Sequence, residues 1–424
     1  IWKNLTLFAI PILLGQIFQQ LYNTADAWIV GHYCNDAQYA AVTSTGSLVF
    51  LLVGFFSGIA VGAGVVIARY FGARDEKNLN TAIHTTVAFG LLAGVLLTVI
   101  GVLCTPALLR AMQTDKSYFR YSVEYFRFYF LGSVAIVMYN LGMGILRAVG
   151  DSKSPLIFLG ISSVLNIILD LTFIIVFKMG VFGAGLATVI AQGISAVLCL
   201  FYIIKNFDIL KFEKDELKFD KARSLSLVSI GVPMALQFSI TAIGSIVLQS
   251  AVNSLGTISV ASATAAMKIQ TVVMGPMESM GIAMATYCGQ NRGAGEYERI
   301  RTGIRQSLIM QMVYCVVSFA AVALFGGVMT MLFIDKRSTD AASIEQILHL
   351  SRTYLVINGL FYPTLGILFI IRNSLQGMGY SFLPMLAGVS ELAARTLVAF
   401  AFVSSFGFSA VCMASPVAWV FADT

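Results

Sequence analysis

Charged residues are spread unevenly along this chain, which alternates between long uncharged stretches and short polar ones. Each uncharged stretch holds roughly 20 residues or more, which is what a helix needs to cross the apolar core of a bilayer, about 30 Å thick. These stretches are 43–68, 87–109, 181–204, 224–267, 306–334, 353–371 and 396–422. The pattern therefore predicts a helical protein that crosses a membrane many times.

Spans with one or two polar interruptions complete a set of twelve predicted transmembrane helices in an all-α polytopic membrane protein. The predicted helices are 5–30, 40–68, 82–108, 120–145, 155–177, 183–204, 225–252, 258–288, 303–333, 344–371, 381–403 and 409–424. The twelfth is too short to cross and is truncated, and the first residue is Ile rather than Met. We therefore expect the natural chain to continue beyond both ends of this sequence.

The composition agrees with a membrane protein and excludes a soluble enzyme. Hydrophobic residues make up 58% of the 424 residues and charged residues only 11%, against roughly 25% in soluble domains. Cys and His show no spacing typical of a metal site. We expect no catalytic residues, no cofactor, a lipid bilayer but no nucleic acid as partner, and a monomer.

Lys and Arg in the predicted loops indicate the orientation in the membrane. With a cytoplasmic N-terminus, 17 of the 27 basic residues lie in cytoplasmic loops and six lie in outer loops. Because cytoplasmic loops carry an excess of Lys and Arg, we expect this orientation, in a multi-pass protein of the cytoplasmic (inner) cell membrane. The same excess accounts for the net charge of +6.

A repeat divides the chain into two six-helix halves. Four residues recur at a shift of 221 (Gly72, Ala73, Thr81, Ile83), and four recur at a shift of 229 (Leu146, Gly150, Ser152, Pro155). We expect an N-terminal lobe at 1–204, a charged cytoplasmic linker at 205–224 and a C-terminal lobe at 225–424. Because six is even, both lobes enter the membrane in the same direction, and a pseudo-twofold axis along the membrane normal relates them.

Two Asp residues within predicted spans are candidates for the functional chemistry. Placing a carboxylate at the centre of a span costs roughly 2.5 to 3.5 kcal/mol on insertion scales, so a carboxylate at such a position is expected to have a function. Asp170 lies one helical turn after Asn166. Asp26 belongs to a polar stripe on one face of the first helix, which consists of Gln16, Gln19, Gln20, Asn23 and Asp26.

Neither acid recurs in the second half, where the equivalent positions lie near Leu248 and Ala399. A hydrogen bond between helices is the structural alternative, but a packing requirement would more often be kept in both halves. Two carboxyl groups in a dehydrated pocket would share one proton, because desolvation and like charge disfavour ionising both. Oxygen ligands suit a hard cation equally well, which leaves Na+ and H+ open.

Other residues predict a substrate cavity. Met side chains adapt to apolar ligands of different shapes, and helix 258–288 carries several on one face; a packed or lipid-facing Met face is the alternative. The predicted cavity residues are Gln16, Gln20, Asn23, Met274, Met277, Glu278 and Met280. Glu391 and Arg395, four residues apart, are expected to neutralise each other.

The whole chain resembles the multidrug and toxic compound extrusion (MATE) family. The resemblance is carried by Pro11, 23–31, 146–155, Asn166 with Asp170, 182–188, 289–294 and 416–419. It implies a prokaryotic exporter whose two lobes enclose a central cavity and whose N-terminal lobe binds the coupling cation. The cation-coupling residues that it implies are Asp26, Asn140, Asn166, Asp170 and Thr188. A Na+ ion would bind at Asp26, Asn166, Asp170 and Thr188.

The function implied by the resemblance is a Na+ or H+ antiporter that exports amphipathic, mainly cationic organic compounds by alternating access. A flippase for a lipid-linked or anionic substrate, with the same superfamily fold, is the alternative. Such a cavity would be expected to contain several Arg or Lys residues for phosphate, whereas only Lys268 and Arg395 lie deep in the second half.

Overall fold

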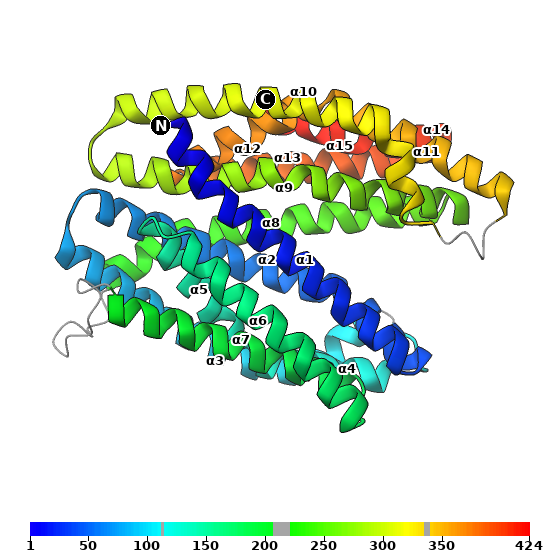
Figure 1. The fold of residues 1–424 in the computed structure, drawn as a ribbon, viewed down its shortest axis with the longest axis horizontal. Helices are drawn as coiled ribbons and strands as arrows, with labels where there is room; N and C mark the ends of the chain where they lie inside the picture. Colours follow the sequence, from blue (N-terminus) through cyan, green and yellow to red (C-terminus); the bar gives the residue numbers. More distant parts are fainter. Residues whose placement is uncertain (112–113, 207–220, 335–339) are drawn as a thin grey trace. The chain divides into compact units, whose positions relative to one another are not determined.

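The computed structural model describes residues 1–111, 114–206, 221–334 and 340–424, and this part of the chain contains helices and no strand. Nine of the described helices are long and apolar enough to cross a membrane, or up to 11 spans when bent pairs are included. The longest, α9, has 37 residues, or about 55 Å, which exceeds a bilayer core of roughly 30 Å. The predicted all-α membrane fold is confirmed (Figure 1).

The helices follow the predicted order. The first half contains α1 (Trp2–Tyr33), α2 (Asp36–Gly72), α3 (Glu76–Ala111), α4 (Phe119–Leu131), α5 (Ser133–Ala148), α6 (Lys153–Leu171), η1 (Thr172–Val176) and α7 (Val181–Asn206). The second half contains α8 (Lys221–Asn253), α9 (Thr257–Gly293), α10 (Tyr297–Met331), α11 (Ala341–Leu360), α12 (Tyr362–Gly377), α13 (Phe382–Leu397), η4 (Val398–Phe402), α14 (Val403–Phe406) and α15 (Phe408–Asp423). The linker predicted at 205–224 falls mainly outside the described residues.

Two spans predicted as single helices are broken. The span 120–145 is divided into α4 and α5 by a 47° bend at Gly132, and the span 344–371 is divided into α11 and α12 by a 52° bend at Phe361. These two positions are 229 residues apart, which is the shift found nearby in the sequence, so the break belongs to the repeated unit. Short π-helical segments, η1 and η4, likewise follow α6 and α13.

The described residues form two compact units. The first, here called the N-unit, contains 10–235 and 289–295; the second, the C-unit, contains 1–9, 236–288 and 296–424. These limits follow packing rather than the chain order of the predicted lobes. Helices α1 and α8 each contribute to both units, and each changes unit within two residues of a proline, Pro11 or Pro233.

Each unit has its own apolar core. In the N-unit, Ile67 of α2, Ile145 of α5 and Cys199 of α7 are buried together. In the C-unit, Tyr354 of α11 and Trp419 of α15 belong to the main core. Many large apolar side chains are exposed instead, which suits a chain surrounded by lipid.

Helix α2 and the end of α9 cross within the N-unit at two glycines. A Cβ added at Gly72 would lie 1.9 Å from the carbonyl oxygen of Gln290, and one added at Gly293 would lie 1.9 Å from that of Arg69. The Gln290 side chain also donates a hydrogen bond to the carbonyl oxygen of Ala148, at 2.8 Å. Because the obstructing atoms belong to the backbone, these two positions require glycine.

We expect Gly72→Ala to destabilise the protein by about 1 to 3 kcal/mol, because the added methyl group forces the two helices apart. Gly160→Ala on α6 is the matched control, since no atom lies within 4 Å of its added Cβ. Helix propensity then favours alanine by about 0.5 to 1 kcal/mol. Thermal unfolding of the purified protein in detergent measures both changes. An unchanged Tm for Gly72→Ala would contradict the tight crossing.

Candidate functional site

The structure brings Asp26 of α1 and Asp170 of α6 together inside the N-unit. Their carboxyl groups lie close enough for the charges to interact, and Asp170 is completely buried. Asp26 Oδ1 and both carboxylate oxygens of Asp170 are buried and accept no hydrogen bond from an N–H or O–H group in the described part of the chain, whereas a proton on either acid would join the two carboxyl groups by a hydrogen bond. Such oxygens are unfavourable in an apolar interior unless a proton or a cation balances them.

Asn166 and Thr188 supply further oxygens next to this pair. Asn166 Nδ2 donates to Thr188 Oγ1 at 3.4 Å, and Thr188 Oγ1 donates to the carbonyl oxygen of Ala184 at 3.1 Å. Asn166 therefore points its amide N–H at α7, while its Oδ1 is buried and has no partner among the described residues. Helix α7 can approach α6 closely because its buried residues here include Ala184 and Ala187.

A cavity of about 10 Å³ lies beside these side chains. This volume is about what one water molecule requires, so the cavity can hold a single small ion or water but not an organic compound. Its lining residues are Tyr22, Leu159, Ser162, Ser163, Asn166, Thr188, Ala191 and Gln192. Gln192 adds one more buried acceptor, Oε1, that lacks a donor within the described ranges.

The buried acid of the C-unit has a different environment. Arg395 Nη2 lies 3.3 Å from Glu391 Oε2, which confirms the predicted pairing, and Arg372 Nη1 of α12 lies 3.0 Å from Glu391 Oε1. Both carboxylate oxygens of Glu391 are thus paired with cations. The Asp26 and Asp170 carboxylates have no such partner among the described side chains, which is the electrostatic difference between the two units.

The comparisons identify the family. The sequence profile of the MatE family matches residues 11–172 and 233–401, which together make up most of the chain. The chain belongs to the MatE family. It is 28% identical over 396 residues to the probable multidrug resistance protein YoeA of Bacillus subtilis, covering 92% of this chain and 84% of that protein. It is 24% identical over 396 residues to the multidrug export protein MepA of Staphylococcus aureus, covering 92% and 85%.

Solved structures show the same fold as this MatE protein. The crystal structure of a MATE protein in complex with MaL6 superposes with a TM-score of 0.90, at 22% identity, over 99% of this chain and 93% of that one. The outward-facing conformation of a multidrug resistance MATE transporter of the MOP superfamily gives a TM-score of 0.88, at 23% identity, over the same shares. The family resemblance seen in the sequence is therefore confirmed.

Two residues of the candidate site were not predicted for this MatE protein. Tyr22 lies one helical turn before Asp26, and Gln192 lies one turn after Thr188, and both line the small cavity. A signal was present in the sequence, because residues four apart share a helix face. Extending each helix face by one turn would have found both residues.

One residue implied by the resemblance lies apart from the others. Asn140 of α5 donates Nδ2 to the carbonyl oxygen of Ile136 on its own helix, at 2.8 Å, and does not line the cavity. The structure brings together Asp26, Asn166, Asp170 and Thr188 but does not show Asn140 joining them. Its role in coupling this MatE protein stays a prediction.

The predicted substrate cavity draws on residues of both units. Gln16, Gln20 and Asn23 belong to α1 in the N-unit, where Asn23 Nδ2 donates to Gln20 Oε1 at 3.4 Å. Met277 and Met280 are buried in cores of the C-unit, so the structure does not place them on an open cavity wall. Their packing follows the alternative of a packed Met face. Met274 and Glu278 are partly buried, and the shared cavity stays a prediction.

Proposed function

We propose that this MatE protein is a multidrug efflux antiporter that exports amphipathic, mainly cationic organic compounds in exchange for Na+ or H+. The names of its relatives, which refer to multidrug resistance and export, support the transport class. The observation that carries the coupling is the set of buried, unpartnered oxygens on Asp26 and Asp170. A proton or a sodium ion would remove the cost of leaving these oxygens unpaired.

The residues of the chain suit either coupling ion. Carboxylate, amide and hydroxyl oxygens from Asp26, Asp170, Asn166 and Thr188 form a donor set of the kind that hard cations prefer. A carboxyl pair in low dielectric also holds one shared proton readily, because like charge disfavours the doubly ionised form. The cavity of about 10 Å³ beside Asn166 and Thr188 has room for one small ion, so the organic substrate would bind elsewhere in the molecule.

Exchange requires that the two sites affect each other. If binding of the coupling ion lowers the affinity for the organic cation, then the organic cation must lower the affinity for the ion by the same factor. Neutralising Asp26 would change the packing of α1, which also contains the Gln16 and Gln20 side chains. We place the N-terminus in the cytoplasm, and the protein in the cytoplasmic membrane, from the excess of Lys and Arg in the loops on that side.

A transport assay tests this proposal. The purified protein is reconstituted into liposomes, and the movement of a fluorescent cationic dye is followed under an imposed Na+ gradient, an imposed pH gradient, or neither. We expect dye movement against its own gradient with one of the two ion gradients and none without. An anionic dye and a labelled lipid in parallel vesicles test the flippase alternative. Movement of either of these in place of the cationic dye would contradict the proposal.

A further inference from the structure

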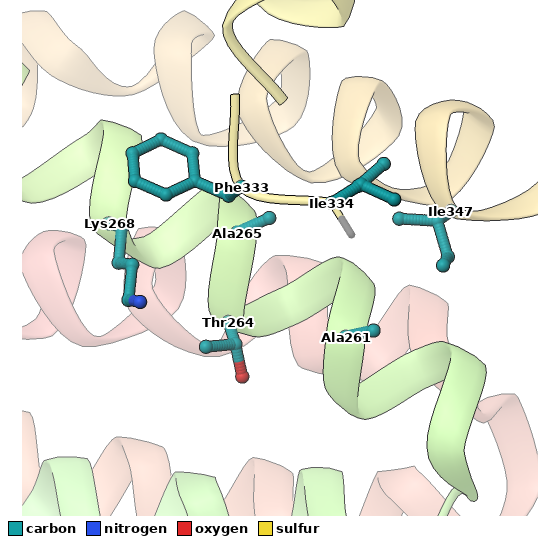
Figure 2. Close-up of a pocket in the computed structure, with 7 residues that line it drawn as sticks. All are labelled: Ala261, Thr264, Ala265, Lys268, Phe333, Ile334 and Ile347. Atoms are coloured by element: carbon teal, nitrogen blue, oxygen red, sulfur yellow. The ribbon is translucent and has the colours of Figure 1, made fainter. Parts of the chain in front are cut away.

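The C-unit contains a cavity of about 220 Å³ that does not involve the carboxyl pair (Figure 2). Three elements form it: the first third of α9, the segment that follows α10, and α11. The residues that line it are Ala261, Thr264, Ala265, Lys268, Phe333, Ile334 and Ile347. The four residues from α9 occupy positions i, i+3, i+4 and i+7 of the helix and therefore share one face, on which the two alanines leave room for a ligand.

Among the described residues that line this cavity, Lys268 is the only charged one. Its side chain is exposed, although it lies within a helix apolar enough to cross the membrane. Its Nζ lies 5.6 Å from the centre of the Phe333 ring, and no carboxylate in the described ranges pairs with it. Figure 2 shows the nitrogen of Lys268 and the hydroxyl of Thr264 on the same side of α9, and both groups are hydrogen-bond donors.

The surroundings of the cavity are apolar and lie at the edge of a membrane span. Phe333 lies two residues after the end of α10 at Met331, so Lys268, whose Nζ lies over the Phe333 ring, is level with this end of α10. Large apolar side chains on this end of α10 are strongly exposed, with Val328 at 67% and Leu332 at 79%. A hydrocarbon chain would cover these side chains, while a charged headgroup at the same level would meet Lys268.

We propose that this cavity binds the headgroup of an anionic phospholipid, with Lys268 and Thr264 contacting its phosphate. The cavity is smaller than the roughly 300 to 1,000 Å³ of sites for drug-sized ligands, which favours a headgroup over a whole organic substrate. One acyl chain of the lipid lies along the exposed end of α10. The lipid thereby contacts α9 together with Phe333 and Ile334 after α10.

Lipid binding to the purified chain in detergent tests this proposal. Native mass spectrometry compares phosphatidylglycerol with phosphatidylcholine of identical acyl chains. We expect the protein to bind phosphatidylglycerol about fivefold more tightly, which is the effect of one basic residue near an anionic headgroup. Lys268→Gln should remove this roughly fivefold preference, so that the variant binds the two lipids equally. Lys268→Arg should retain the preference for phosphatidylglycerol.

Lys205→Gln is the matched control. Lys205 also lies over an aromatic ring, 5.8 Å from the centre of Phe201, but it does not line this cavity. It should keep the full preference for phosphatidylglycerol, and all three variants should unfold at the temperature of the original protein. Equal binding of the two lipids by the original protein would overturn the proposal. So would a preference that survives Lys268→Gln, or one that Lys205→Gln removes to the same extent.

Discussion

Replacing either Asp26 or Asp170 with Asn will abolish ion-driven efflux while the protein stays folded. Asn has almost the same shape as Asp, but it carries no negative charge to balance a cation and does not exchange a proton near neutral pH. Because the two carboxyl groups interact with each other, loss of either one removes the pair. We therefore expect ion-driven dye transport to fall to the level of protein-free liposomes.

The thermal stability of the two variants shows whether they lose transport while remaining folded. Both variants remove buried oxygens that lack hydrogen-bond partners among the described residues, so the thermal stability should be equal or higher. Asp115→Asn, in the loop before α4, is the control and should transport like the original protein. If Asp26→Asn and Asp170→Asn both kept ion-driven efflux, the assignment of this pair as the coupling site would be wrong.

Glu391→Gln will cause the largest loss of stability, about 3 to 5 kcal/mol. The variant removes the one carboxylate that pairs with both Arg372 and Arg395, whose side chains are only 13% and 9% exposed, and leaves Asp423 as the acid that still interacts with Arg372. Arg395 Nε already lacks a partner among the described atoms, so the remaining guanidinium groups cannot be satisfied locally. Thermal or denaturant unfolding in detergent measures the change.

An exposed ion pair serves as the control for this effect. Glu124 lies 3.2 Å from Arg120, and the two side chains are 44% and 89% exposed. Glu124→Gln should therefore cost less than about 1 kcal/mol, because water already solvates both charges. Similar losses for Glu391→Gln and Glu124→Gln would show that the buried cluster contributes no more than a surface pair.

The helices and the two Asp residues could be predicted because a bilayer leaves a strong signal in sequence. Apolar runs long enough to cross a membrane are rare in soluble proteins. Acids within such runs are rare as well, and they usually have a function. The bends at Gly132 and Phe361 were missed because hydropathy records the length of an apolar run and not its direction. Pro363 in the first turn of α12 was the one available signal.

Contacts between helices were the least predictable part of the site. Arg372 reaches Glu391 from a neighbouring helix, across 19 positions in sequence, and no periodicity within either helix indicates this. The Met residues of α9 show the same limit, because a Met face suits a cavity and a packed core equally well. At Met277 and Met280, the packing of the neighbouring helices buries both side chains in the apolar core.

The glycine crossing of α2 and α9 is formed by equivalent residues of the two repeats. Gly293 follows Gly72 by 221 residues, and Gln290 follows Arg69 by the same number. The two close approaches are therefore one contact made twice, with the partners exchanged, as in the isologous interface of a twofold homodimer. Such an exchange of partners is the arrangement that a local twofold axis between the two repeats produces. A substitution at either glycine should therefore disturb an equivalent close approach, Gly72 against Gln290 and Gly293 against Arg69.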